Sequence, residues 1–358
     1  MKNLLIAIVA LFLLGIQSCS KDNKEKTVSL KPGWIEQAFE AVQQSRFDRI
    51  KAISWWHENW EEEDGEIVQL RIDSSPESLE AFRRSVAPSV FVNQPVFDNN
   101  KLVPSPQGIY FAAFPDFGGN EEIITTQRIL DFENLAQKQI TWAFFSDNWM
   151  GDIRFPEQEV QTIHQLGRVP YIRMMARSQF EENVTDPNYS MQNIIDGQFD
   201  NDLLQWFTEA AQVGYPLLIE FGTEVNGEWF PWNGVHNGGG TTTAYGDPNK
   251  PDGPERFVDA YRHIIDLSRQ AGADNITWFF HLDADEEPQE DWNRFENYYP
   301  GDNYIDWVGI SVYGALSKKD ELIAFDQKLD QVYSRVLTLT QKPIAILETG
   351  VVEYYVKK

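Results

Sequence analysis

The chain has 358 residues, of which 55 are acidic and 30 basic, giving a formal net charge of −25 at pH 7. That charge excludes nucleic acid and an anionic membrane surface as the main partner, and it favours a neutral ligand. A hydrophobic content of 42% with 12 tryptophans is enough for a sizeable core. Tryptophans in an acidic protein also suit stacking on sugar rings, although most tryptophans in any protein belong to its core.

The N-terminus predicts export. A short basic start at residues 1–3 precedes the uncharged apolar run 4–16, which is too short to span a bilayer and is typical of a signal peptide. Ile16-Gln17-Ser18-Cys19 resembles a bacterial lipoprotein cleavage box, and Cys19 is the only cysteine. We therefore expect residues 1–19 to be a signal peptide, Cys19 to carry lipid, and residues 20–30 to form a disordered tether. The alternative is an ordinary signal peptide with an incidental cysteine.

The remainder of the chain predicts one large α/β domain, residues 31–358, with no disulfide. We expect strands at 108–114, 140–145, 169–175, 216–222, 275–281, 305–312 and 342–348. Between them, helical patterns occur at 123–136, 158–165, 203–211, 254–270 and 322–339. Strands that alternate with helices predict a parallel sheet, and strands that are apolar on both faces indicate a (β/α)8 TIM barrel.

Two glutamates stand at the carboxyl ends of predicted strands. Glu224 follows the apolar strand 216–222, and Glu348 closes the strand 342–348. Catalytic residues of such barrels lie at these strand ends, and a carboxylate there is costly unless it faces a polar cleft. Glycosidic bond cleavage requires such a pair. We expect Glu224 to be an acid/base with a raised pKa and Glu348 to be an ionised nucleophile, about 5–5.5 Å apart.

The residues after Glu224 form a loop of about thirty residues without a regular pattern, and loops of that length are usually functional. Its Trp229 and Trp232 are candidate stacking platforms for sugar rings. The triple glycine 238–240 lacks the Lys-Ser/Thr of a phosphate-binding loop, which argues against a nucleotide.

Three motifs resemble glycoside hydrolase family 26, which includes β-mannanases, mixed-linkage β-glucanases and xylan-active members. Residues 224–234, Glu-Val-Asn-Gly-Glu-Trp-Phe-Pro-Trp-Asn-Gly, resemble its acid/base motif, and residues 345–350 resemble its nucleophile strand. Tyr313, in Ser-Val-Tyr-Gly, resembles the tyrosine that hydrogen-bonds the nucleophile. The resemblance implies a retaining O-glycosyl hydrolase like the endo-acting β-mannanases. Mannanases of the family have a histidine where this chain has Thr223, so mannan specificity does not follow.

Weaker candidates flank these motifs. Trp149 closes the second predicted strand and either lines the cleft or packs at its rim, while His281 is either a substrate contact or a core residue. Arg173 shares the inward alternation of its strand, and Glu220 shares that of Glu224. The five histidines show no metal spacing, and the acidic run 283–287 is more typical of a solvated loop than of a calcium site. We expect no cofactor, no metal, and a monomer.

The seven strands leave only ten residues after Glu348, too few for an eighth strand and its helix. The missing elements appear first in the chain: residues 31–87 contain helix 34–46, strand 49–55 and helix 76–86. We therefore predict a circularly permuted barrel, with residues 88–107 as a linker and strands one to seven in 108–350. The strand 49–55 resembles the family's last strand, whose tryptophan forms the floor of the sugar site. Alternation turns Trp55 or Trp56 inward, and we favour Trp56.

The sequence thus predicts an exported lipoprotein of the outer membrane or cell surface that cleaves a β-linked polysaccharide. The alternative from another class is a non-catalytic, surface-anchored glycan-binding barrel, which has no need of two glutamates at strand ends. The pattern leaves open which polysaccharide is cut and whether cleavage is internal or terminal. It also leaves open whether the protein faces the periplasm or the outside of the cell. A small N-terminal module beside a truncated barrel is the alternative to the permutation.

Overall fold

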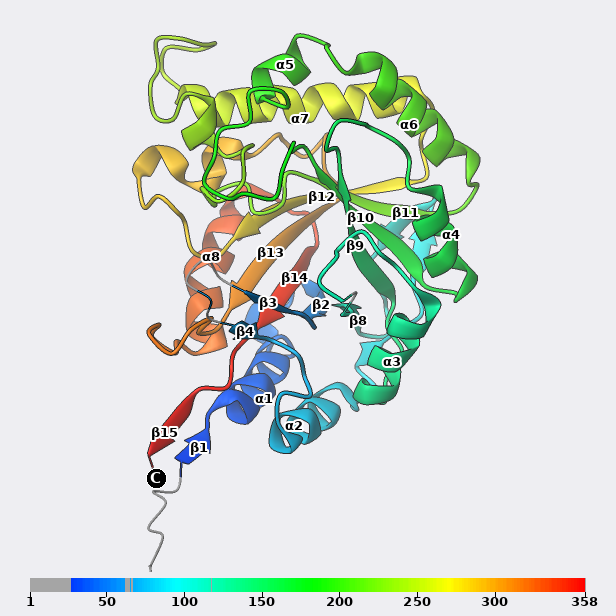
Figure 1. Ribbon diagram of the computed structural model, residues 1–358, viewed down its shortest axis with the longest axis vertical. Coiled ribbons are helices and arrows are strands. Elements are labelled where there is room, and N and C mark those ends of the chain that lie inside the picture. The colour runs from blue at the N-terminus through cyan, green and yellow to red at the C-terminus, as the bar shows by residue number, and fades with distance from the viewer. Residues whose placement is uncertain (1–26, 62–64, 66, 117, 358) are drawn as a thin grey trace, which may run out of the picture.

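The computed structural model describes residues 27–61, 65, 67–116 and 118–357. The expected signal peptide, Cys19 and most of the expected tether lie outside these residues. Eight parallel strands form a closed barrel (Figure 1). In barrel order they are β2 (Ile50–Trp56), β14 (Ile344–Gly350), β13 (Trp307–Tyr313), β12 (Ile276–Asp283), β11 (Leu217–Phe221), β10 (Val169–Met175), β9 (Trp142–Asn148) and β8 (Ile109–Phe114), which pairs with β2 again. The (β/α)8 TIM barrel predicted from the sequence is confirmed.

Helices cover the outside of the barrel (Figure 1). They are α1 (Lys31–Ala41), α2 (Pro76–Val86), α3 (Thr126–Ala136), α4 (Glu157–Gln165), α5 (Met191–Ile195), α6 (Asp200–Gln212), α7 (Asp252–Gln270) and α8 (Phe325–Leu339). Short 3₁₀ turns occur at η1 (Ser45–Phe47), η2 (Gly234–Asn237), η3 (Asp291–Asn293) and η4 (Phe295–Tyr298). The helix starts follow local chemistry: Ser75 accepts a hydrogen bond from the Ser78 N–H (3.1 Å) to cap α2. Within the described residues, no helix is both long and apolar enough to cross a membrane.

The strand predicted at 49–55 lies where the permutation requires it. In β2, Ala52 is in register with Ala345 of β14 on one side and with Tyr110 of β8 on the other. The first barrel strand of the chain therefore closes the barrel between its second and its last strand. This placement excludes the alternative of a separate N-terminal module beside a truncated barrel.

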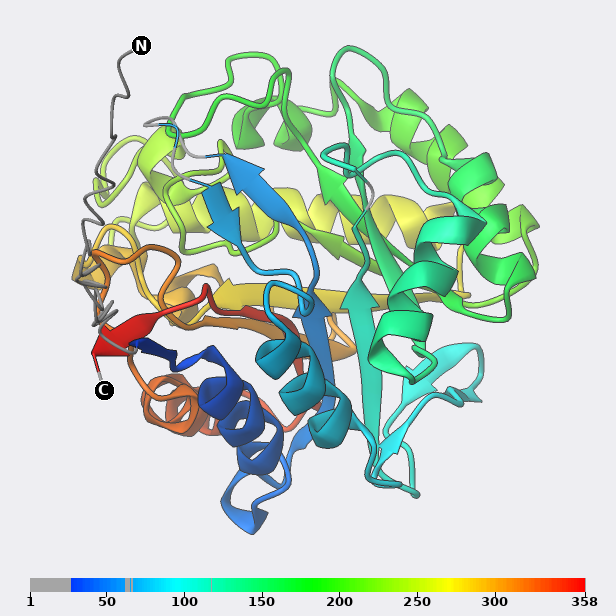
Figure 2. The same ribbon diagram turned by 60° about the horizontal axis from the view of Figure 1, so that its bottom comes forward.

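The two ends of the described chain meet in a small antiparallel sheet (Figure 2). Its strands are β1 (Thr27–Ser29) and β15 (Tyr355–Lys357). Thr27 is in register with Lys357, and the Leu30 N–H donates to the Tyr354 carbonyl at 2.8 Å. The expectation of a disordered tether through residue 30 is therefore wrong for residues 27–30, because paired backbone groups hold them against the C-terminal strand.

The segment 88–107 is not a free linker. It contains the strands β5 (Phe91–Val92), β6 (Val96–Asp98) and β7 (Lys101–Val103). The Leu102 N–H donates to Thr277 Oγ1 (2.8 Å), and its carbonyl accepts from Trp307 Nε1 (2.8 Å). Because Thr277 and Trp307 lie near the amino ends of their strands, this hairpin closes the floor of the barrel and leaves the opposite end for a site. A second hairpin, β3 (Asn59–Glu61) and β4 (Ile67–Gln69), follows β2.

Candidate active site

Glu224 and Glu348 both lie at the carboxyl end of the barrel. Glu348 is the fifth residue of β14, and Glu224 stands three residues beyond β11. Glu224 has a φ of +50°, a left-handed conformation that costs a residue with a side chain roughly 1 kcal/mol or more. Such strain persists where the surrounding structure enforces it, often at functional sites. Both side chains are buried, with 7% of Glu224 and 4% of Glu348 exposed.

The two oxygens of Glu348 have different surroundings. Oε2 accepts a hydrogen bond from the Tyr313 hydroxyl at 2.8 Å. Oε1 has no hydrogen-bond partner among the described residues, and Arg173 Nη2 lies 3.4 Å from it. Burial raises the pKa of Glu348 to about 7, Arg173 opposes that rise, and the charge of Glu224 adds to it. The expectation that Glu348 is ionised throughout is therefore wrong below neutral pH, because desolvation outweighs its cationic neighbour.

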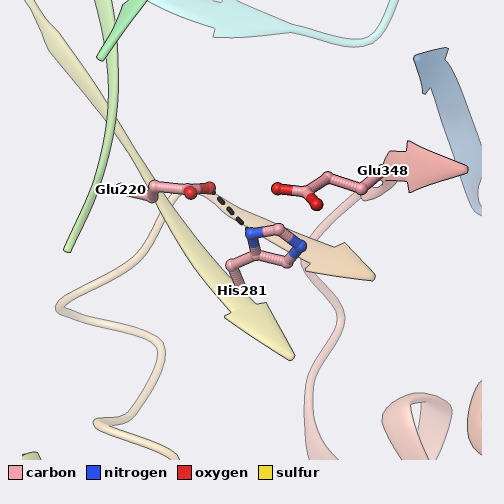
Figure 3. A group of neighbouring side chains, drawn as sticks. All are labelled: Glu220, His281 and Glu348. Carbon is pink, nitrogen blue, oxygen red and sulfur yellow. Dashed lines mark hydrogen bonds and ion pairs between the residues drawn. The ribbon is translucent and has the colours of Figure 1, made fainter. Parts of the chain in front are cut away.

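A buried ion-pair network lies beneath Glu348 (Figure 3). The Glu220 carboxylate accepts from His281 Nδ1 (2.9 Å) and from the Tyr171 hydroxyl (2.8 Å), and Arg173 Nε lies 3.4 Å from its other oxygen. Burial alone would raise the pKa of Glu220, but His281 and Arg173 together lower it to about 2. Burial alone would lower the pKa of His281, but the ion pair with Glu220 raises it above its ordinary value. Both pKa shifts favour an ion pair between the Glu220 carboxylate and a protonated His281.

Glu220, His281 and Glu348 also have spacing that a metal ion could use, since one ligand atom from each lies within 4.8 Å of the others. The Arg173 guanidinium, however, lies 3.4 Å from an oxygen of each carboxylate. A divalent cation at this position would meet that fixed positive charge and the imidazolium. These residues are thus better described as an ion-pair network around the Arg173 guanidinium than as a metal site.

Trp56 and Trp229 are the candidate sugar platforms that lie next to charged site residues. Trp56 stacks on Phe114 (centroids 4.0 Å apart), and the Arg173 guanidinium carbon lies 4.9 Å from its ring centroid. Trp55 faces away from the barrel interior and donates its indole N–H to the Leu70 carbonyl. The favoured inward orientation of Trp56 is thus observed. Trp229 is partly exposed and donates its indole N–H to Glu224 Oε2 at 2.8 Å.

Three other predicted substrate contacts are buried in the protein. His281 is fully buried, and its second nitrogen, Nε2, lies 2.9 Å from the Ser311 hydroxyl. Trp232 is fully buried, stacks on Phe230 and donates to the Thr223 carbonyl. Trp149 is 1% exposed and packs among aromatic side chains. We correct these three assignments, because at most 1% of each residue is exposed, compared with 6% of Trp56.

Asparagine side chains fix the loop that carries Glu224. Asn226 Nδ2 donates to the Asp283 carbonyl (2.9 Å), and Asn226 Oδ1 accepts from the Asp283 N–H (2.8 Å). Asn293 in turn donates to the Asn226 carbonyl, and Asn233 donates to the Val225 carbonyl. All three asparagines are fully buried. These hydrogen bonds tie the irregular segment to the end of β12 and so restrain the position of Glu224.

Comparison with known proteins decides the family. Residues 162–341, half of the chain, match the profile described as glycosyl hydrolase family 26. The chain belongs to glycosyl hydrolase family 26. The match spans β10 to α8 and includes Glu224 and Tyr313 but not Glu348.

Individual relatives of the family are distant. Endoglucanase H of Acetivibrio thermocellus is 25% identical over 223 residues, which are 62% of this chain and 22% of that protein. A mannan endo-1,4-beta-mannosidase of Bacillus subtilis is 26% identical over 194 residues, 50% of this chain and 42% of that protein. The chain thus spans less than half the length of either relative.

Solved structures of the family give similarly weak overall superpositions. A Bacillus subtilis mannanase has a TM-score of 0.42 at 15% identity. The aligned region covers 64% of this chain and 76% of the mannanase chain. A family 26 β-mannanase of Bacteroides ovatus has a TM-score of 0.42 at 14% identity and covers 90% and 77%.

Two charged residues of the site, Arg173 and Asp283, have interactions that the sequence analysis did not predict. Arg173 was noted only as facing inward, yet it contacts Glu348, Glu220 and Glu121. Asp283, at the end of β12, is buried, and burial together with the charge of Glu224 raises its pKa well above the ordinary value. A charged residue inside an otherwise apolar strand was the available signal for Arg173. Asp283 sat in an acidic run that resembled a solvated loop.

Replacing Glu348 by Gln should stabilise the protein at alkaline pH. With a pKa raised from 4.5 to about 7, the folded state binds more protons than the unfolded state between these values, so stability falls as pH rises through this window. At pH 8 the ionised, buried carboxylate costs about 1–3 kcal/mol, which Gln avoids, and the advantage should shrink towards pH 5. Thermal unfolding at both pH values measures it.

The matched control is Glu181→Gln, the same substitution at an exposed position. It should leave the unfolding temperature unchanged at both pH values. A Glu348→Gln protein that is less stable than wild type at pH 8 would show that Arg173 requires this charge more than burial penalises it.

Proposed function

We propose that this protein is a retaining glycoside hydrolase acting on a β-linked polysaccharide. The observation that carries the proposal is the state of Glu348. One of its oxygens is held by Tyr313 while the other lacks a hydrogen bond, and Glu224 is near enough to raise its pKa. A nucleophilic carboxylate requires this arrangement, with one oxygen fixed and one available for attack.

The first chemical step uses both carboxyl groups. The Glu348 carboxylate attacks the anomeric carbon while Glu224 donates a proton to the departing glycosidic oxygen. The C–O bond to the leaving sugar breaks, and an ester to Glu348 forms. Because interacting carboxyls release their protons in two steps, the reactive form is the one in which the pair holds a single proton. Arg173 and Tyr313 favour placing the negative charge on Glu348.

The second step returns the enzyme to its starting state. Glu224, now ionised, removes a proton from a water molecule, whose oxygen attacks the anomeric carbon and releases Glu348 as carboxylate. Two inversions give net retention of configuration. Trp229, hydrogen-bonded to Glu224, positions the acid/base, and Trp56 provides a ring at the floor of the sugar site.

The substrate class that fits is a neutral β-mannan, mixed-linkage β-glucan or xylan. The site holds two carboxylates and aromatic rings, which suit an uncharged sugar, and the two relatives are named as an endoglucanase and a mannosidase. Thr223, which replaces the histidine of mannanases, is fully buried, and its hydroxyl is bonded to Glu220. The Thr223 side chain thus points toward the buried Glu220 and not toward the substrate. It therefore does not select among the three polysaccharides.

The test is hydrolysis by the purified domain of mannan, mixed-linkage β-glucan and xylan, with the anomer of the product followed by NMR. We expect retention on at least one of them. Glu348→Gln should lose turnover by 10⁴-fold or more while retaining binding, and Glu224→Gln should lose roughly 10²–10⁴-fold. The Glu224 variant should recover on aryl glycosides with good leaving groups, which need no protonation.

Inverted product would remove the nucleophile assignment from Glu348, and wild-type turnover by Glu348→Gln would do the same. Binding of a polysaccharide without any cleavage by the wild type would favour the non-catalytic glycan-binding protein instead.

We also infer that the protein is exported and anchored to a membrane through lipid on Cys19. The apolar run 4–16 and the box ending at Cys19 support this inference. Changing Cys19 to Ala should move the protein from the membrane fraction to the soluble fraction of fractionated cells. Retention of the variant in the membrane fraction would indicate an uncleaved hydrophobic anchor.

The order of elements further supports a circular permutation of the family's barrel. β2 resembles the family's last strand, yet it comes first in this chain and pairs with β14, which carries the nucleophile. The paired strands β1 and β15 place the two ends together, and the segment 88–107 then joins what are ends in other members. Ends that lie close together at the surface permit such a rearrangement.

A reordered gene tests the permutation. Residue 357 is joined to residue 27 by a short Gly-Ser linker, and the chain is opened between Asn99 and Asn100, which form the turn of the β6–β7 hairpin. This protein should fold with an unchanged circular dichroism spectrum and retain activity within about tenfold. An insoluble or inactive product would show that the natural chain order is required for the fold.

A further inference from the structure

A second cavity lies on the outer wall of the barrel, away from Glu224 and Glu348. It has a volume of about 500 Å³ and lies between α4 and α6, with Tyr215 of the following loop at its edge. This volume falls within the range of about 300–1,000 Å³ for small-molecule sites. The proposed reaction makes no use of this cavity.

The lining combines flat rings with hydrogen-bonding side chains. The rings of His164 and Tyr215 lie parallel, with centroids 3.5 Å apart. The amides of Gln165 and Gln212 also line the cavity, are exposed, and have no hydrogen-bond partner among the described residues. An amide offers two donors and an acceptor, so these side chains can bind a ligand with many hydroxyl groups.

The charges of the lining limit the ligand. Glu157 and Glu209 are carboxylates, and no lysine or arginine lines the cavity. An anionic ligand is therefore disfavoured, in keeping with the net charge of −25. Stacked rings, free amides and carboxylate acceptors together match a neutral, hydroxyl-rich molecule, which is the chemistry of a glycan.

Phe155 is shared by this cavity and a smaller neighbouring one. Phe155 lines the outer cavity and also a smaller one of about 230 Å³, which includes Ser146 and Asn148 at the end of β9. The Ser146 hydroxyl is hydrogen-bonded to Arg173, the cation beneath Glu348. The outer cavity and the smaller cavity therefore adjoin at Phe155.

We propose that the cavity between α4 and α6 is a second binding site for a neutral β-linked polysaccharide. In its choice of ligand, this inference rests on the proposed function, because the chain bound outside is the kind of chain cut inside. The outer site gives a long polymer a second point of attachment on the barrel wall, whereas a short oligosaccharide engages the mouth alone.

Affinity electrophoresis in gels containing glucomannan, mixed-linkage β-glucan or xylan tests the proposal. The variant Gln165→Ala/Gln212→Ala removes two exposed amides of the lining. The matched control is Asn201→Ala/Gln212→Ala. It also removes two exposed amides, but Asn201, in the first turn of α6, lies outside the cavity lining, and Gln165 is kept. A second variant, His164→Ala, removes one ring of the stacked pair. Each protein is also assayed for kcat/KM on a β-linked tetrasaccharide.

We expect the double lining variant and His164→Ala to lose retardation by the polymer about five- to tenfold, with tetrasaccharide kcat/KM within twofold of wild type. The control should lose less than the double lining variant. Retardation equal to wild type in both lining variants would overturn the second site. A wild type that is retarded and releases no product, while the lining variants are not retarded, would contradict the proposed function and leave the outer site standing. A wild type that no polymer retards would contradict the outer site even if hydrolysis occurs.

Discussion

The site depends on the ion pairs of one buried group, the Arg173 guanidinium. It lies 3.4 Å from oxygens of Glu348 and Glu220 and 3.2 Å from Glu121, and only 3% of the residue is exposed. A charge at this depth costs several kcal/mol unless it is paired, so strands β10, β11 and β14 must keep their positions for the network to close. The same requirement fixes the orientation of Glu348, because its carboxylate is one of the partners.

The barrel is organised in layers along its axis. The hairpin of β6 and β7 closes the floor, aromatic side chains such as Trp142 and Trp307 fill the level above, and the Arg173 network lies beneath the two glutamates. Each layer provides the next with a rigid base, which an active site needs if its groups are to stay within a fraction of an ångström of the productive geometry. Glu224 differs from Glu348 because it lies on a loop and not on a strand. Hydrogen bonds from buried asparagines restrain that loop.

Much of this arrangement could be predicted from the sequence because it depends on local patterns. The alternation of apolar strands with helices predicted the barrel, and the count of strands led to the position of β2. Glutamates at strand ends led to the prediction of Glu224 and Glu348 as a pair, and the structure places both at the carboxyl end of the barrel. The hydrogen bond from Tyr313 was implied only by resemblance to the family, and it is present.

What could not be predicted depends on how distant segments pack. Trp149 and His281 lie at predicted strand ends and Trp232 lies in the loop after Glu224, as exposed platforms would, and only the folded structure shows that protein covers them. The segment 88–107 has the composition of a linker, yet its backbone groups bond to Thr277 and Trp307, which are about 175 and 205 residues away. The pKa of Glu348 reflects a balance of burial against Arg173 that residue types alone do not determine.

The position of Glu348 in the last barrel strand has a consequence for how the molecule matures. β2 remains an open edge on one side until β14 arrives, and their paired residues Ile50 and Ile344 are separated by nearly the whole domain. Contacts of such long sequence separation form late in folding, because the loop-closure entropy must be met first. Glu348, one of the carboxylates paired with Arg173, thus enters with the segment that seals the barrel. An incomplete chain emerging from a ribosome lacks Glu348 and its ion pair with Arg173, so the carboxyl pair at the barrel mouth is assembled only when the fold is complete.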